Sequence, residues 1–93
     1  MIIVWDEIKR TANLAKHRMD FADLDEAFFD RAAIAPSVEG RLVAVGEFKG
    51  ATIVAVAFRP LGSEAFSVIS MRPASRKERK LHDQQRQSRA PSA

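Results

Sequence analysis

The chain has 93 residues, of which 46% are hydrophobic and 29% charged, and it carries a net charge of +3. This length fits one domain with a modest core. The absence of cysteine excludes disulfides, thiolate metal sites and a thiol nucleophile, and it agrees with a reducing cytoplasm. The apolar run at the N-terminus is too short for a signal peptide, and no run reaches the roughly 20 apolar residues of a membrane helix.

A short apolar strand over residues 2–5 opens the chain. Asp6 follows it and can cap a helix over residues 7–17. The spacing predicts that this helix turns one apolar face toward a sheet, made of Ile8, Ala12 and Ala15 with Thr11 and Leu14 beside them.

A second helix is predicted from a cap at Asp20 to Asp30-Arg31. Its core-facing stripe follows the helical period and consists of Phe21, Leu24, Ala27 and Phe28. We also expect the aromatic side chains of the chain to lie in the core, chiefly Trp5, Phe21, Phe28, Phe29 and Phe66.

From residue 32 onward the pattern changes to the period of two that is typical of strands. A weak strand over residues 32–37 contains Pro36, so we expect it at a sheet edge. Three stronger strands then read as an antiparallel meander, with turns at 49–50 and 60–63, and cover residues 41–48, 51–59 and 65–72.

The last predicted element is a basic helix. Ser75 and Glu78 form a capping box, which places the start of this helix at about Arg76. Leu81 is its one large apolar residue, so the helix should lean only weakly on the sheet.

The polar residues 84–93 are expected to form a disordered tail, which leaves residues 1–83 as a single domain. The predicted fold is α+β, in the order β-α-α-β-β-β-β-α. Two N-terminal helices pack on one face of a compact antiparallel sheet, and the other face is left to the C-terminal basic helix.

Positive charge is concentrated toward the C-terminus. Residues 72–89 hold seven Lys or Arg against two acidic residues, whereas the rest of the chain holds eight against ten. This asymmetry indicates a polyanion or an acidic partner, and the alternative is a tail that only aids solubility.

The sequence contains no phosphate-binding glycine loop, no metal-ligand cluster and no nucleophile elbow. Its two histidines, its arginines and lysines and its carboxylates suit cleavage of RNA without a metal or other cofactor. In that reaction the 2′-hydroxyl of the RNA attacks, side chains move protons, and Arg stabilises the charge on phosphorus. Basic patches also bind DNA, acidic proteins and membranes, so composition alone indicates only a small α+β domain with a basic end.

Two blocks of the sequence resemble the BrnT-type toxins. The first block holds Trp5-Asp6-Glu7, Lys9, Asn13-Leu14, Lys16-His17, Phe21, Ala27 and Phe29-Asp30. The second holds residues 68–74 and 76–79, and together the match spans residues 1–82. The resemblance implies a RelE-like fold and a cytoplasmic ribonuclease toxin of a type II toxin–antitoxin pair, which cleaves RNA without metal and inhibits translation.

The resemblance also implies a partner, a ribbon-helix-helix antitoxin that neutralises the toxin and joins it in repressing their operon. A dimer or a 2:2 complex with the antitoxin would follow, with no membrane involved. An alternative function is a catalytically degenerate binding module that acts only as antitoxin partner and co-repressor. A third is direct binding of nucleic acid by the C-terminal tail.

Three departures from the family pattern affect the site. Arg18 stands where the family usually has glycine after Lys-His, so the first helix should end without a left-handed residue. Glu39 and Arg41 are the counterparts of an E-x-R element in a shortened region. The tyrosines of the family are replaced by Phe58 and His82, so either His82 serves as proton donor or activity is weakened.

The candidate catalytic residues each have a structural alternative. Arg72 ends the last strand, where it either contacts phosphate or forms an ion pair. Arg76 and Arg79 lie one helical turn apart, where they either contact RNA or antitoxin or form a solvated face. His82 and His17 either transfer protons or are surface residues, His82 paired with Glu78.

Four further basic residues are candidates for binding RNA phosphates. They are expected to act through charge rather than chemistry, and each has a plain surface role as its alternative. These residues are Lys16, Arg41, Lys77 and Lys80.

Overall fold

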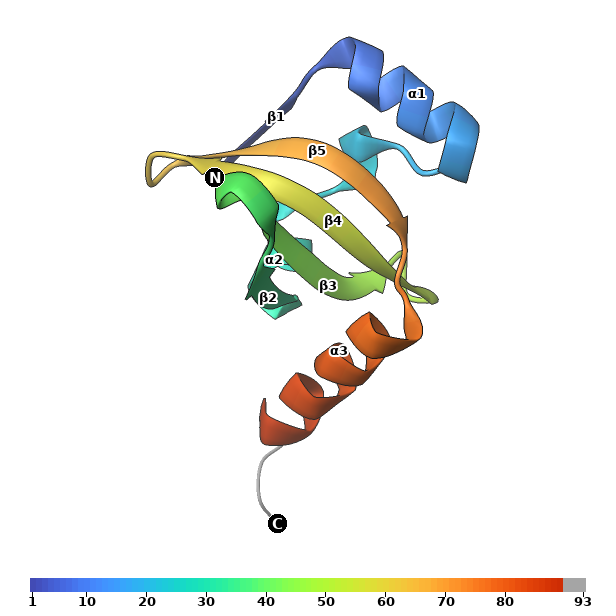
Figure 1. The fold of residues 1–93 in the computed structure, drawn as a ribbon, viewed down its shortest axis with the longest axis vertical. Coiled ribbons are helices and arrows are strands. Elements are labelled where there is room, and N and C mark those ends of the chain that lie inside the picture. The colour runs from blue at the N-terminus through green and yellow to red at the C-terminus, as the bar shows by residue number, and fades with distance from the viewer. Residues whose placement is uncertain (90–93) are drawn as a thin grey trace.

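A computed structural model describes residues 1–89 of the chain (Figure 1). The strands are β1 (Ile2–Trp5), β2 (Ala33–Pro36), β3 (Leu42–Phe48), β4 (Thr52–Leu61) and β5 (Ala65–Pro73). The helices are α1 (Glu7–His17), α2 (Glu26–Arg31) and α3 (Arg76–Arg89), with short 3₁₀ turns η1 (Phe21–Asp23) and η2 (Val38–Gly40). The architecture is α+β, as the sequence predicts.

The strands form one sheet in the order β1-β5-β4-β3-β2. The meander of β3, β4 and β5 is confirmed, and β2 with Pro36 lies at an edge as expected. The expectation of a purely antiparallel sheet is wrong, because β1 pairs in parallel with β5. The helices carry the chain from β1 to the far edge at β2, and the meander returns it to β1, so the first and last strands meet in the same direction.

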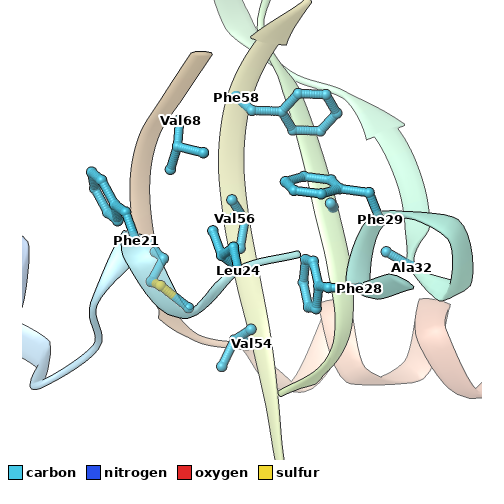
Figure 2. Close-up of a cluster of buried hydrophobic side chains, with 11 residues drawn as sticks. Phe21, Leu24, Phe28, Phe29, Ala32, Val54, Val56, Phe58 and Val68 are labelled. Carbon is cyan, nitrogen blue, oxygen red and sulfur yellow. The ribbon is translucent and has the colours of Figure 1, made fainter. Parts of the chain in front are cut away.

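One face of the sheet is covered by η1 and α2, and it holds the main core (Figure 2). Phe29 lies at the centre of this cluster, with its ring 5.2 Å from the ring of Phe58 and 5.0 Å from that of Phe66. Gly46 of β3 makes room for α2, because a Cβ there would lie 3.0 Å from the ring of Phe28. We call this side of the sheet the closed face.

The single second helix predicted from Asp20 is wrong in one respect. Leu24 has extended dihedrals, with φ −76° and ψ 144°, and it divides the segment into η1 and α2. Asp25 caps α2 by accepting a hydrogen bond from the Phe28 amide at 2.9 Å. The break keeps Phe21 and Phe28 buried but leaves Ala27 exposed.

Helix α1 lies beside β5 (Figure 1). It does not pack through the apolar stripe that the sequence suggested. Ile8, on that stripe, is 79% exposed, whereas Asn13 is only 8% exposed. The side chain of Asn13 accepts a hydrogen bond from the Met71 amide at 3.0 Å and donates one to the Met19 carbonyl at 3.1 Å. The buried side of this helix is therefore the side that carries the polar Asn13, and not the apolar stripe.

The end of α1 also differs from expectation. Arg18 adopts the left-handed conformation itself, with φ 56°, and its amide donates to the Leu14 carbonyl at 2.8 Å. The usual left-handed cap is therefore kept without glycine. A side chain in this conformation costs about 1–2 kcal/mol, because its Cβ crowds the backbone.

The opposite side of the sheet, which we call the open face, is covered only in part. Ala33, Val45 and Ala55 form a small second cluster there, and α3 packs against β2 and β3. Helix α3 reaches Arg89, so residues 84–89 are helical where a disordered tail was expected, and residues 90–93 of that tail lie outside the described residues. Between residues 1 and 89, no helix has the length and apolar character needed to span a membrane.

Candidate active site

Arg72 lies on the open face, near the end of β5. In the sheet register it stands opposite Ala55, a buried residue of the small cluster on this face. Its guanidinium binds the carboxylate of Glu78 at two points, with Nη1 donating to Oε1 at 2.7 Å and Nη2 to Oε2 at 2.9 Å. The structural alternative of an ion pair is therefore present, and it fixes the orientation of an Arg whose side chain is still 45% exposed.

The start of α3 holds Glu78 in place for this pair. The predicted capping box is confirmed, because the Glu78 amide donates to Ser75 Oγ at 3.2 Å and the Ser75 amide donates to Glu78 Oε1 at 2.8 Å. The hydrogen bonds from Arg72 lower the pKa of Glu78 from 4.5 to about 2, against the opposing effect of burial. The same pairing raises the pKa of Arg72. Both groups are therefore charged at neutral pH.

A groove of about 780 Å³ opens beside Arg72, between the first turns of α3 and the open face. Lys77 and Lys80 line its helical wall, and Val43 and Val45 line its floor. The groove thus combines three cationic side chains with an apolar floor, and Glu78 is the acidic residue that lines it. This is the arrangement expected for a polyanion, because long cationic side chains meet phosphates while bases contact the apolar surface.

Arg76 and Arg79 share a face of α3, as predicted, but that face does not line the groove. Both are exposed, and neither side chain has a hydrogen bond or ion pair within residues 1–89. Lys77 and Lys80, which follow them in the sequence, line the groove instead, and both are exposed.

His82 lies on another side of α3, away from the Arg72 groove. It lines a second hollow of about 660 Å³ between α2, the β3–β4 turn and α3, together with Phe28 and Phe48. The residue is 7% exposed, and its Nδ1 atom is buried without a hydrogen-bond partner in the part of the chain that the structure describes. Asp83 lies 3.9 Å from Nδ1, and the surface pair with Glu78 is not formed, since that carboxylate binds Arg72.

Lys16 and His17 lie in the last turn of α1 and line neither hollow. Arg41 comes directly before β3 and is half-buried. Of the nine candidate residues, the structure brings together Arg72, Lys77 and Lys80. The other six lie outside the groove.

Two residues of this region were missed as functional candidates. Glu78 was visible in the sequence as part of a capping box, but its second role as the partner of Arg72 required the turn at Pro73. Asn13 belongs to the first block of the BrnT resemblance, and its contact with the Met71 amide fixes β5 one residue before Arg72. A polar residue in a helix of few large apolar side chains was the available signal.

The described part of the chain contains no group of three or more His, Asp or Glu residues that could hold a metal ion. The groove offers fixed positive charge, chiefly from Arg72, whose planar guanidinium has the geometry to bind a phosphate at two points.

Two comparisons with known proteins identify the family of this chain. Residues 5–78 match the family model described as the ribonuclease toxin BrnT of type II toxin–antitoxin systems. The 1.1 Å crystal structure of the Brucella abortus ribonuclease toxin BrnT is similar over 82% of this chain and 99% of that chain, with 58% identity and a TM-score of 0.77. No curated protein matches the chain. The chain belongs to the family of BrnT ribonuclease toxins of type II toxin–antitoxin systems.

Proposed function

We propose that this toxin cleaves RNA on its open face, with Arg72 as the residue that stabilises the charge on the scissile phosphate. The observation that supports this is the position of Arg72, fixed by a strand and by Glu78, in a groove that Lys77 and Lys80 also line. Donors held in place before the reaction stabilise a transition state more effectively than donors that must first be ordered.

The pairing with Glu78 leaves Arg72 able to bind a phosphate. A guanidinium carries five N–H groups, and Glu78 accepts from one on each terminal nitrogen. A second contact of Nη1 goes to the Pro73 carbonyl at 3.3 Å. Nε and the remaining hydrogen of Nη2 are free of these contacts, so a phosphate oxygen can be bound without breaking the ion pair.

The chemistry of this proposal needs no metal, because the RNA supplies its own nucleophile, the 2′-hydroxyl group. Lys77 and Lys80 contact neighbouring phosphates as point charges. His82, His17, Arg76 and Arg79 lie outside the groove, so the proposal gives them no contact with the scissile phosphate.

Family membership supports the cellular part of the proposal. A ribonuclease toxin of a type II system has an antitoxin partner and an RNA substrate. We infer that cleavage takes place in the cytoplasm and inhibits translation, and that a ribbon-helix-helix protein neutralises the toxin in a 2:2 complex that represses the operon.

The test is cleavage of end-labelled RNA by the purified protein in excess EDTA. We expect the wild-type protein to cleave and Arg72→Ala to lose at least two orders of magnitude in rate, as when one fixed charge-stabilising donor is removed. Arg72→Lys, which keeps the charge but loses the planar fork, should remain strongly impaired.

Arg31→Ala is the matched control, because Arg31 is an exposed arginine on α2, away from the groove. It should cleave like the wild type. Full activity in a folded Arg72→Ala protein would overturn the assignment of Arg72. No cleavage by the folded, antitoxin-free wild type would favour the degenerate binding module instead.

A further inference from the structure

Two further arginines, Arg41 and Arg59, lie at the open face outside the Arg72 groove. Leu42 and Phe58 are the last pair of the β3–β4 ladder, and Arg41 and Arg59 are the residues next to that pair, Arg41 before β3 and Arg59 within β4. Arg59 in turn pairs with Ser67 of β5. Side chains alternate along a strand, which places Arg59 on the same face as Ala55 and Arg72.

The two guanidinium groups differ in their hydrogen bonds. Arg59 donates from Nη2 to the Glu39 carbonyl at 2.9 Å, in a turn where Glu39 and Gly40 both have positive φ. Nε of Arg41 is buried and has no hydrogen-bond partner among the described residues. A buried donor without a partner costs about 1–3 kcal/mol, so a bound acceptor would recover free energy here.

Among residues 1–89, neither Arg41 nor Arg59 forms an ion pair with a carboxylate. The contact of Arg59 with Glu39 goes through the backbone carbonyl. Two neighbouring arginines repel each other unless an anion lies between them, and the planar forks of arginine suit a phosphate.

The open face connects this pair to the Arg72 groove. Val43, which lies on the floor of the groove, is the next residue on the same side of β3 after Arg41. From Arg59 to Ala55, the partner of Arg72, there are four residues of strand, or about 13 Å. This distance corresponds to a few nucleotides of an extended strand rather than to one phosphate.

We propose that Arg59 and Arg41 form a second phosphate-binding subsite, which takes a backbone phosphate of the RNA a few nucleotides away from the one at Arg72. The inference rests on the proposed function, since it extends the same RNA track across the open face. Arg59 binds substrate here and does not touch the reacting atoms. Its loss should therefore raise the KM for long RNA, with little change in kcat and little effect on a dinucleotide substrate.

The experiment measures binding of a fluorescent, uniformly 2′-O-methylated RNA 12-mer, which lacks the nucleophile and cannot be cleaved. Fluorescence anisotropy at several salt concentrations gives the slope of log K against log salt. For a single strand this slope changes by about 0.7 for each phosphate contact. We expect Arg59→Ala to reduce the slope by about 0.7 and Arg59→Lys to restore it, while Arg31→Ala keeps the wild-type value.

Arg59 is exposed, so Arg59→Ala should fold, and circular dichroism verifies this. An unchanged slope in Arg59→Ala would overturn the subsite, even if the wild type cleaves RNA. A wild type that binds the 12-mer with a slope dependent on Arg59 but fails to cleave RNA would keep the subsite and overturn the proposed function. Absence of binding by the wild type would overturn both.

Discussion

The two faces of the sheet are built from alternate residues of the same strands, and they differ in almost every physical property. The closed face carries Val54, Val56 and Phe58 under the aromatic rings of α2, all of them nearly inaccessible to water. The open face carries Arg59 and Arg72 beside small residues, and only α3 covers part of it. The comparison indicates that stability is concentrated on one face, while the other is free to carry charge for binding.

The largest effect on stability should come from the closed face. Phe58→Ala removes a ring that is 1% exposed and packs on Phe29 and Phe66, so we expect a loss of about 3–5 kcal/mol in the free energy of unfolding. Arg59→Ala, the next residue on the open face, should change it by no more than about 0.5 kcal/mol. Urea unfolding of both variants measures the difference, and similar losses in the two would refute the division between the faces.

Asn13→Ala tests the contact that joins α1 to the strand carrying Arg72. The variant leaves the Met71 amide and the Met19 carbonyl without their partner, which should cost about 1–3 kcal/mol. Because β5 is anchored one residue before Arg72, RNA cleavage should also fall under conditions where the variant is folded. Ile8→Ala, a change at a 79% exposed position of the same helix, is the control and should lose little; equal losses in the two variants would argue against this contact.

The ion pair on the open face predicts a pH dependence. The pKa of Glu78 is lowered from 4.5 to about 2 in the folded protein, so its contribution is complete above about pH 4.5 and is lost as the pH falls through 2. Glu78→Gln removes this contribution, which should be about 1 kcal/mol because the Arg72 side chain is 45% exposed and water screens the pair. The free energies of unfolding of the wild type and of Glu78→Gln should therefore converge as the pH approaches 2. A difference that stays constant with pH would rule out the ion pair as its source.

The smallest expected effect is a gain. Arg18→Gly relieves the left-handed conformation at the end of α1 and should stabilise the protein by up to about 1 kcal/mol, with part of the gain offset by the greater freedom of glycine when unfolded. Thermal unfolding measures this shift. Since Arg18 lies on neither face of the sheet, cleavage should be unchanged, and a loss of stability would mean that the Arg18 side chain makes a favourable contact.

The strands of the meander could be predicted because β-branched residues alternate along them and the Lys49-Gly50 turn separates them. The capping box of α3 could be predicted because it is local. The parallel pairing of β1 could not, since it depends on where the far end of the chain returns. The docking of α1 through Asn13 could not be predicted from the apolar period. The two hydrogen bonds of Asn13 to backbone groups outside α1 decide which side of the helix is buried, and Ile8 stays exposed.

The same limits apply to the candidate site. Arg72 was identified from its place at the junction of a strand and a basic helix. The division of α3, with the lysines at 77 and 80 lining the groove and the arginines at 76 and 79 outside it, depends on how the helix turns after Pro73. In the sequence Arg59 is an ordinary charged residue of a strand, and only the register places it next to the last β3–β4 pair, which Arg41 also adjoins.

The hydrogen bond from the Met71 amide to Asn13 also bears on self-association. Strand β1 pairs with β5 only as far as Val68, so the outer edge of β5 beyond that point has no neighbouring strand. An unpaired edge can recruit a strand from another molecule, which is a common route to aggregation. Asn13 occupies one of these amides and α1 lies alongside it, so the edge next to Arg72 is closed to strand addition while the face beside it stays open.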